Sequence, residues 1–422
     1  MKLSELCPVD LPPADLPIEV VIGPTASTQL AEVAGRYLGE RPLVLADPDT
    51  WAASGQPKVN GALHLLDAHP HADDDTVESV RRALHGHTGV LAIGSGTIND
   101  LAKRAAHLEG RPYVVLGTAA SMNGYASGIA AILSDGLKTT VPARPPMAII
   151  LDTKILAEAP PRLTQAGLGD LMSKPVSDSD WWLANELEGS GYSELPSQIV
   201  DHAVTAAITA ASGLAQGDQE AHGALGKALV LSGVAMVVAG SSSPASGGEH
   251  LLSHLWDMER LSAGQETRLH GAQVGVTTCI TSALYQRLIA LEEVQLPERP
   301  TWAAEAARIT REHGQLANVV LAQSEKKFSR SAARAEVLSS RWPQIRAGLA
   351  ARALPSPREI REALDAAGAP STLAALDEPR KNAARIFRLA RDIRDRVTVL
   401  DLAFELGVLP QAIEDVLTEA GV

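Results

Sequence analysis

Short apolar runs alternate with helical segments from about residue 18 to residue 155, and this alternation constrains the fold more than any other feature. The runs are IEVVIG, RPLVLADP, GVLAIGSG and RPYVVLGT, and stretches with helical spacing separate them. Strands that alternate with helices in this way form a parallel sheet. The first part of the chain is therefore predicted to be a Rossmann-like α/β domain.

The pattern changes after the segment AIILDTKIL, which the pair Pro160-Pro161 closes. Beyond this point Ala, Leu, Glu and Arg recur at helical spacing, interrupted by patches rich in Gly, Ser and Pro. A boundary at about 155–162 follows from this change. We expect an α/β domain over residues 1–160 and an all-α domain over residues 161–422.

Charge argues against two classes of partner. The chain has 37 Lys and Arg residues against 50 Asp and Glu residues, which gives a net charge of -13. Such a balance disfavours nucleic acid and anionic membranes as partners, although it leaves room for a local basic pocket that binds a small anion. The longest apolar stretch, 228–239, is shorter than the roughly 20 residues of a membrane helix. We expect it to be a buried helix.

The cysteine content indicates a reducing compartment. Cys7 and Cys279 are the only cysteines. Two are too few for a disulfide framework or for a metal site built from thiolates. The N-terminus mixes acidic residues with prolines and lacks the basic and then apolar order of a signal peptide. We therefore expect a cytoplasmic protein.

The segment GSGTIND, residues 94–100, follows the run VLAI and precedes a helix. Glycines at such a turn let a pyrophosphate approach the backbone, and the N-terminus of the helix offers free N–H groups and the positive end of its dipole. A plain turn between strand and helix explains a Gly-X-Gly sequence equally well. The motif nevertheless predicts a nucleotide site, because the preceding strand also ends in a suitable acid.

That acid is Asp47, in LVLADP. A carboxylate at this position accepts hydrogen bonds from an adenosine ribose and repels a 2′-phosphate, which favours NAD over NADP. An ordinary turn before Pro48 is the alternative explanation. The next strand is followed by GTAASMNGYAS, residues 117–127, which is either a segment that lies along a bound cofactor or a solvated loop.

Three histidines and one acid in the helical half form a candidate metal site. Asp170 lies in GLGDLMSK, His250 and His254 lie in SGGEHLLSHLWDM, and His270 lies in LHGAQVGV. One carboxylate with two imidazoles is a common ligand set for a catalytic divalent metal. His250 and His254 are four residues apart, so both face one side of a helix. Hydrogen-bonded helix histidines are the alternative for each residue taken alone.

These segments, in this order, resemble the sn-glycerol-1-phosphate dehydrogenases, a branch of the iron-containing alcohol dehydrogenase and dehydroquinate synthase-like superfamily. The matching stretches span most of the chain and are GSGTIND, TAASMNGYAS, SDGLKTTVPA, PPMAIILDTKILAEAPPRLTQAGLGDLMSK, PASGGEHLLSH, LHGAQVGV and RDIRDRVTVLDLAFELGVL. The resemblance implies a dehydroquinate synthase-like fold. It also implies a dinucleotide-binding domain over 1–160 and a helical domain over 161–422 that binds metal and substrate.

The resemblance further assigns roles to residues. It implies one divalent metal, Zn, Ni or Fe, with Asp170, His250 and His270 as its ligands. Asp170 and His254 would contact the substrate and act in catalysis. The residues implied to contact NAD(H) or NADP(H) are Asp47, Gly94, Ser95, Gly96, Thr97, Ile98, Thr118, Ala119, Ala120, Ser121 and Ser127.

One residue departs from the family pattern. The family typically has Asp at the substrate-contacting position where this chain has Asn123. Asn is nearly isosteric with Asp but uncharged, and it can donate as well as accept a hydrogen bond. The departure leaves open a different phosphorylated or phosphonate-bearing substrate, and reduced activity.

The resemblance implies reversible reduction of dihydroxyacetone phosphate to sn-glycerol 1-phosphate, a reaction of phospholipid metabolism, by a homodimer or larger homo-oligomer. The metal would stabilise the developing alkoxide as a Lewis acid, and His254 would position the substrate or relay a proton. Two alternatives stay open: a dehydroquinate synthase-like cyclase that uses NAD transiently, and a non-catalytic relative that binds NAD.

Overall fold

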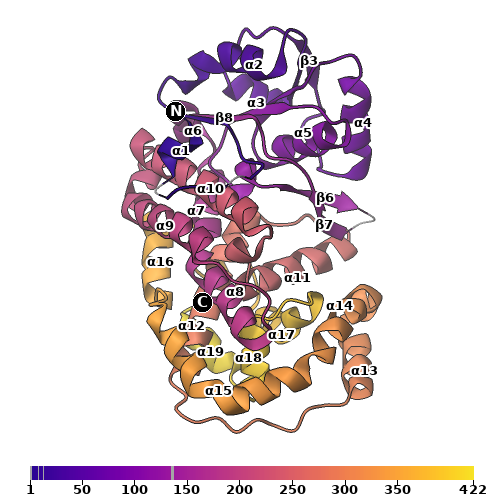
Figure 1. Ribbon diagram of the computed structural model, residues 1–422, viewed down its shortest axis with the longest axis vertical. Helices are drawn as coiled ribbons and strands as arrows, with labels where there is room; N and C mark the ends of the chain where they lie inside the picture. Colours follow the sequence, from indigo (N-terminus) through magenta and orange to yellow (C-terminus); the bar gives the residue numbers. More distant parts are fainter. Residues whose placement is uncertain (1, 8, 13, 135–136) are drawn as a thin grey trace. The chain divides into compact units, whose positions relative to one another are not determined.

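The computed structural model describes residues 2–7, 9–12, 14–134 and 137–422 (Figure 1). Contacts within the chain divide it into two compact units. The first unit comprises Met1–Leu171, Leu195–Ser241 and Ala366–Ala369. The second comprises Met172–Glu194, Ser242–Asp365 and Pro370–Val422. Helices from beyond residue 160 thus contribute to both units, and the assignment of binding roles to 1–160 and 161–422 stays a prediction.

A six-stranded sheet forms the centre of the first unit, and every strand pair in it is parallel. The strand order is β1 (Glu19–Gly23), β8 (Ala148–Asp152), β5 (Tyr113–Gly117), β4 (Val90–Gly94), β2 (Leu43–Ala46) and β3 (Ala62–Leu65). Strands β4, β5 and β8 are buried along their whole length. A parallel strand covered on both faces needs an almost continuous apolar sequence, which is why these strands are visible in the chain.

Helices α2 to α5 lie in the connections between the strands, whereas α1 precedes β1 and α6 follows β8 (indigo to purple in Figure 1). They are α1 (Leu3–Leu6), α2 (Leu30–Leu38), α3 (Pro48–Ala53), α4 (Asp74–Leu84), α5 (Gly96–Leu108) and α6 (Thr153–Glu158), with 3₁₀ turns η1 (Ala26–Gln29) and η2 (Asn123–Ala126). Leu30, Val33 and Leu38 of α2 are buried in one core cluster with Val44 of β2 and Leu91 of β4. The α/β prediction for the first part of the chain is confirmed.

Two parts of the first unit were not predicted. Strand β3 is the edge strand, and its side chains Leu63 and Leu65 are each 45% exposed. A separate antiparallel hairpin consists of β6 (Ile129–Ser134) and β7 (Leu137–Pro142). Strand β3 has the short sequence ALHL and β7 has the sequence LKTTVP, and neither carries the continuous apolar run of the buried parallel strands.

The first unit also contains α7 (Pro161–Met172, to Leu171), α9 (Glu194–Ala215, from Leu195) and α10 (Gln219–Ala239). Among the described residues, α10 is the one helix that is long and apolar enough to cross a membrane, but 72% of its apolar window is buried within the structure. Residues 228–239 belong to this helix, so the expected buried helix is present.

The second unit is built from helices. They are α8 (Lys174–Glu188), α11 (Gly248–Ser262), α12 (His270–Ile289), α13 (Trp302–His313), α14 (Ala317–Ser329), α15 (Ser331–Ala351), α16 (Pro357–Ala366), α17 (Arg380–Leu389), α18 (Val399–Glu405) and α19 (Ile413–Ala420), with the 3₁₀ turns η3 (Ser243–Ala245), η4 (Gly314–Leu316), η5 (Ala374–Leu376) and η6 (Ala390–Ile393). Helix α12 is central, since α8, α11, α15, α18 and α19 all contact it. The prediction of a helical C-terminal region is confirmed.

Candidate functional site

The glycine-rich turns lie at the carboxyl ends of neighbouring strands. Gly94 ends β4 and Gly117 ends β5, and the two residues are partners in the sheet register. The backbone N–H of Thr118 donates to the carbonyl of Gly94 over 3.1 Å. Asp47 follows β2, which pairs with β4 on its other side. Ligands of open parallel sheets bind at this edge, so the predicted cofactor residues share one edge of the sheet.

The N-terminus of α5 fits an anionic group. Its N-cap residue is Ser95, whose side chain caps no backbone N–H of the helix and instead lies 2.6 Å, Oγ to Oγ, from Ser121. The N–H groups of the first turn, which contains the predicted contacts Thr97 and Ile98, have no partner within the helix. Together with the helix dipole they are suited to bind a pyrophosphate.

The two glycines of this turn serve different purposes. A Cβ atom on Gly94 would lie 2.6 Å from Cβ of Ile98, so packing alone requires glycine there. A Cβ atom on Gly96 would meet nothing closer than Cγ of Met122 at 3.6 Å. Packing therefore does not explain Gly96, and the close approach of a ligand to the backbone here stays a prediction.

Asp47 has a structural partner that also explains its presence. It is the N-cap of α3, and its Oδ1 accepts a hydrogen bond from the backbone N–H of Thr50 over 2.8 Å. The turn before Pro48, stated above as the alternative, is therefore present. A contact between Asp47 and a ribose stays a prediction.

The segment that follows β5 is packed and not solvated. Ala119, Ala120 and Ser127 are each at most 1% exposed, and Thr118 is 5% exposed. The hydroxyl of Tyr125 donates to the carbonyl of Ala119 over 2.8 Å. The solvated-loop alternative is therefore wrong for these residues. Whether they contact a cofactor stays a prediction.

Lys103 holds this segment in place, and the sequence analysis missed it. Its Nζ donates to the carbonyl of Gly124, to Oγ of Ser127 at 3.1 Å and to the carbonyl of Ile129 at 3.0 Å. The side chain is fully buried, and burial lowers the pKa of Lys103 to about 8, although the nearby Asp100 acts in the opposite direction. A lysine on the otherwise apolar buried face of the helix after GSGTIND was the available signal.

Asn123 connects this segment to two helices. Its backbone N–H donates to Oδ2 of Asp170 over 3.3 Å, and its Nδ2 donates to Oγ of Ser232 over 3.3 Å. A Cβ atom on Gly167 would lie 1.9 Å from the carbonyl oxygen of Ala120, so α7 packs closely against the segment. The predicted substrate residue Asn123 thus lies next to the predicted metal ligand Asp170. Asp135 and Gly136 of the matching stretch SDGLKTTVPA lie outside the described residues.

Three histidine rings gather at two helices of the second unit. His250 and His254 belong to α11, and His270 begins α12. Their ring centroids are 5.9 Å apart for His250 and His254, 5.1 Å for His250 and His270, and 5.5 Å for His254 and His270. The contact between α11 and α12 therefore brings together residues that are 16 to 20 positions apart in the sequence.

The donor set fits a divalent metal. Asp170, His250 and His270 each offer one ligand atom, and these atoms lie within 4.8 Å of one another. A carboxylate with two imidazoles suits zinc and other first-row transition metals and leaves coordination positions for a substrate. Among the described residues this is the group of three with such an arrangement, and His254 is not part of it. Ligation by these residues stays a prediction.

Glu249 orients His250, and sequence reasoning missed this residue as well. Its Oε1 lies 2.7 Å from Nδ1 of His250 and accepts hydrogen bonds from Oγ of Ser177 at 2.7 Å and the N–H of Gly247 at 2.8 Å. Burial raises the pKa of Glu249, but the hydrogen bonds from His250, Ser177 and Gly247 lower it overall. A carboxylate bonded to Nδ1 fixes the histidine tautomer and leaves Nε2 for a metal. The dipeptide Glu-His was the available signal.

A second buried acid lies close to Glu249. Asp180 accepts hydrogen bonds from the hydroxyl of Tyr285 at 2.5 Å and from the N–H groups of Gly248 and Val399 at 2.6 Å each. Burial and the charge of Glu249 raise the pKa of Asp180 to about 8, against the effect of these hydrogen bonds. Asp180 thereby ties the start of α11 to the last turns of α12 and to the start of α18.

The amino-acid sequence is similar to those of known dehydrogenases. A family model described as iron-containing alcohol dehydrogenase matches residues 21–160. A glycerol-1-phosphate dehydrogenase [NAD(P)+] of Bacillus velezensis is 33% identical over 293 residues, which are 66% of this chain and 74% of that protein. The protein of the same name from Pyrococcus furiosus is 35% identical over 278 residues, 64% of this chain and 79% of that one.

Solved structures with the same fold are more distant in sequence. A probable glycerol dehydrogenase from Sinorhizobium meliloti superposes with a TM-score of 0.64 at 17% identity and covers 97% of this chain and 99% of its own. A maleylacetate reductase from a Rhizobium species superposes with a TM-score of 0.60 at 18% identity, and 98% of each chain is covered. The predicted fold class is confirmed by these likenesses.

Proposed function

The chain belongs to the glycerol-1-phosphate dehydrogenase family within the iron-containing alcohol dehydrogenases, and on this basis we propose that it is a metal-dependent, NAD(P)H-linked oxidoreductase. Its proposed reaction interconverts dihydroxyacetone phosphate and sn-glycerol 1-phosphate. The grouping of the Asp170, His250 and His270 ligand atoms within 4.8 Å carries this proposal on the structural side.

The proposed division of labour follows the contacts described above. Asp170, His250 and His270 hold a divalent metal, which when bound supplies Lewis acidity for the substrate carbonyl. Glu249 keeps Nδ1 of His250 engaged, so that Nε2 is presented as the ligand atom. His254, one helical turn from His250, positions the substrate or supplies a proton to the new hydroxyl.

Cofactor binding is proposed for the edge of the sheet. The N-terminal turn of α5 binds the pyrophosphate of NAD(P)H, which supplies the hydride when bound. The contacts at Asp47, at residues 94–98 and 118–121, and at Ser127 are part of this proposal. Asp47 favours NAD because a 2′-phosphate would lie near a carboxylate.

Asn123 bears on the identity of the substrate. Its side-chain amide donates to Ser232 in this structure, and its backbone N–H contacts Asp170. The amide oxygen can accept a hydrogen bond from a substrate hydroxyl as a carboxylate would. Asn123 lacks the negative charge of the family's Asp, however, and this difference favours a different phosphorylated or phosphonate-bearing ketone as the second candidate.

The decisive experiment measures NADH and NADPH oxidation with dihydroxyacetone phosphate. Protein stripped by a chelator would be reloaded separately with Zn²⁺, Ni²⁺, Fe²⁺ or buffer alone. We expect turnover that depends on the metal and consumes NADH stoichiometrically. Stoichiometric consumption excludes a dehydroquinate synthase-like cyclase, which returns its NAD. Folded protein that binds NADH and turns over no phosphorylated ketone with any metal would instead indicate a non-catalytic relative.

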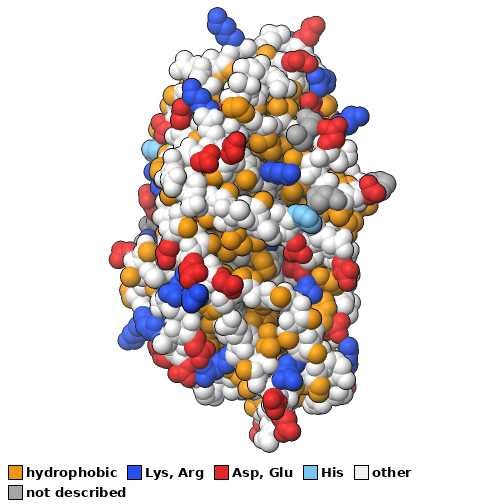
Figure 2. Space-filling view, turned by 90° about the vertical axis from the view of Figure 1, so that its left-hand side faces the viewer, with side chains coloured by type: hydrophobic (Ala, Val, Ile, Leu, Met, Phe, Trp, Pro, Cys, Tyr) orange, Lys and Arg blue, Asp and Glu red, His pale blue; other side chains and the backbone are white. Residues whose placement is uncertain are grey.

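The cellular setting is part of the same proposal. We propose a cytoplasmic homo-oligomer that takes part in phospholipid metabolism. Both cysteines are free and buried, which suits a reducing compartment. On the face shown in Figure 2, Lys and Arg side chains are interspersed with Asp and Glu side chains, an arrangement that offers no extended basic surface to nucleic acid. Sedimentation velocity tests the oligomeric state.

A further inference from the structure

A cavity of about 400 Å³ lies within the second unit. It is formed by the segment 296–300 and by residues of α13, α14, α15, η6, α18 and the turn after α18. None of the residues predicted to bind cofactor, metal or substrate lines it. The volume is in the range of pockets that bind small organic molecules.

Much of the cavity wall is apolar. Phe328 of α14, Leu338 of α15 and Phe404 of α18 contribute side chains, and the segment 296–300 adds Leu296 and two prolines. A wall of this kind favours a ligand with an apolar body, because burial of that body releases water from both surfaces.

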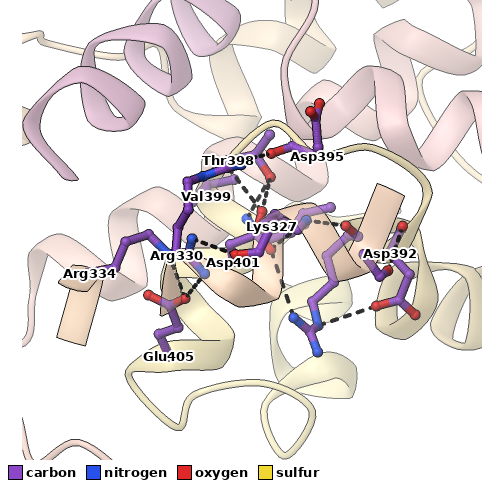
Figure 3. A network of polar contacts seen from close by, with 12 residues as sticks. Lys327, Arg330, Arg334, Asp392, Asp395, Thr398, Val399, Asp401 and Glu405 are labelled. Atoms are coloured by element: carbon purple, nitrogen blue, oxygen red, sulfur yellow. Dashed lines mark hydrogen bonds and ion pairs between the residues drawn. The ribbon is translucent and has the colours of Figure 1, made fainter. Parts of the chain in front are cut away.

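Cations of the wall form ion pairs with acids that lie in the wall or behind it, as part of a larger network of polar contacts (Figure 3). Nζ of Lys327 lies 2.7 Å from Oδ1 of Asp401, and Nη2 of Arg334 lies 2.6 Å from Oε1 of Glu405. Arg391 pairs with Glu305, and its guanidinium lies 3.6 Å from the ring centroid of Phe404. These partners neutralise one another within the protein.

The residues that line the wall carry no net formal charge. The cations are Arg299, Lys327, Arg334 and Arg391, and the acids are Glu298, Glu305, Asp392 and Glu405. A charged ligand would add a charge to this balanced wall and would also lose its own hydration, so the balance favours an uncharged ligand.

One acceptor in the wall lacks a donor. Both bonds that Arg334 makes to Glu405 end on Oε1. Oε2 of Glu405 is buried and has no hydrogen-bond partner among the described residues. A buried acceptor without a donor is unfavourable, and a ligand that brings a donor relieves that cost.

We propose that this cavity binds an uncharged, largely apolar molecule with a hydroxyl group, and that a small rotation of the Glu405 carboxylate turns Oε2 into the cavity to accept a hydrogen bond from that hydroxyl. The proposal is independent of the reaction proposed above, since its ligand contacts none of the residues given a role there. It requires no covalent step.

The first test compares three ligands that each have an eight-carbon chain but differ in the head group. Purified full-length protein without NADH would be titrated with 1-octanol, octanoate and octylamine in a calorimeter. We expect 1-octanol to bind at least tenfold more tightly than either ion. If octanoate bound most tightly, the exposed Arg299 would dominate recognition. If octylamine bound most tightly, free carboxylates of the wall would dominate it. Either result, or no binding of 1-octanol, would overturn the proposal.

A matched pair of variants locates the binding. Ala335 of α15 lines the cavity, and Ala332 lies on the exposed side of the same helix. Ala335→Phe should weaken 1-octanol binding at least tenfold, and Ala332→Phe should leave it unchanged. Equal binding by both variants would place the alcohol elsewhere, including at the proposed catalytic site, and would refute the cavity assignment.

The role of Glu405 is tested with a ligand that can accept a hydrogen bond but cannot donate one. 2-Octanone should bind more weakly than 1-octanol to the unaltered protein, and Glu405→Gln should narrow that difference because its amide presents a donor. Circular dichroism would verify that the variant is folded, since Glu405 also holds Arg334. If the variant does not fold, the test rests on the ratio of the affinities of the unaltered protein for 1-octanol and 2-octanone. Equal affinities would contradict the proposed hydrogen bond to Glu405.

Discussion

Oε1 of Glu249 lies 2.7 Å from Nδ1 of His250, so two adjacent residues of α11 are joined through their side chains. The bond uses one nitrogen of the imidazole and leaves the other for the ligand group with Asp170 and His270. Partners of this kind orient metal-binding histidines and raise their basicity. The pairing leads to the first prediction.

Glu249→Gln should weaken metal binding by about 10–100-fold, the usual effect of removing such a partner. Competition with a chromogenic chelator measures the affinity directly. Glu259→Gln is the matched control, because Glu259 lies on the same helix and pairs with Arg385 at its more exposed end. Equal affinity of the two variants would show that Glu249 has no orienting role.

A second experiment distinguishes the predicted metal ligands from the predicted substrate contact by whether each variant keeps its metal. His250→Ala and His270→Ala should both lose bound metal on dialysis, as measured by mass spectrometry of the metal. His254→Asn should keep the metal, because His254 is outside the ligand group, and should raise KM for the substrate. Full occupancy in both ligand variants would refute the assignment.

The two glycines before α5 should respond differently to substitution. Gly94→Ala places a Cβ 2.6 Å from Ile98 and should lower the free energy of unfolding by about 1–3 kcal/mol, as overpacking does. In Gly96→Val the Cβ makes only an ordinary contact, 3.6 Å from Cγ of Met122, and the variant should fold normally. It should nevertheless weaken NADH binding about tenfold or more, equivalent to about 1.4 kcal/mol. Fluorescence titration with NADH would distinguish the two, and normal NADH affinity in Gly96→Val would argue against a pyrophosphate at this turn.

Lys103 predicts a specific pH dependence of stability. The pKa of Lys103 is lowered by burial to about 8, below the value of about 10.4 for an unfolded chain. Between these two values the unfolded state binds the extra proton, so the contribution of Lys103 to stability should rise as pH rises from about 8 to about 10.4, by roughly 3 kcal/mol in total. Below about pH 7 it should be constant.

Chemical denaturation of the protein and of Lys103→Met across this pH range measures that contribution as a difference between the two. Other titrating groups are common to both proteins and cancel. A difference that falls with rising pH would show that the carbonyls of Gly124 and Ile129 hold the charge more strongly than burial disfavours it.

Asn123→Asp should change both stability and activity. The new carboxylate would stand beside Asp170, whose Oδ2 already lies 3.3 Å from the backbone N–H of residue 123. Repulsion between the two carboxylates should lower Tm of the metal-free protein, and added Zn²⁺ should restore it. In the reloaded protein we expect kcat/KM for dihydroxyacetone phosphate to rise. An unchanged Tm, with and without metal, would indicate that the two side chains do not interact.

The parts of the fold that could be predicted from the sequence are those whose burial requires a recognisable short pattern of apolar residues. Strands β4, β5 and β8 are buried on both faces, and their apolar runs are continuous for that reason. Strand β3 was missed because it lies at the sheet edge, where the sequence ALHL leaves two leucines exposed. Its existence depends on pairing with β2 and not on a pattern of its own.

The site shows the same division. His250 and His254 were recognised as neighbours from their helical spacing, whereas their closeness to His270 depends on how α11 packs against α12. Lys103 and Glu249 were missed because a lone charged residue within a helical sequence usually faces water. Their roles depend on acceptors and donors from other elements, such as Ile129 and Ser177, and no spacing rule specifies those.

Helix α5 offers its first turn at Gly96 and fixes the segment after β5 through Lys103, seven residues further on. Seven residues are close to two helical turns, so both functions depend on one face of one helix. Inserting or deleting a single residue between them would rotate Lys103 by about 100° away from the carbonyls it holds. Sequences that share this arrangement should therefore vary between these positions by substitution alone, and their length here should stay constant.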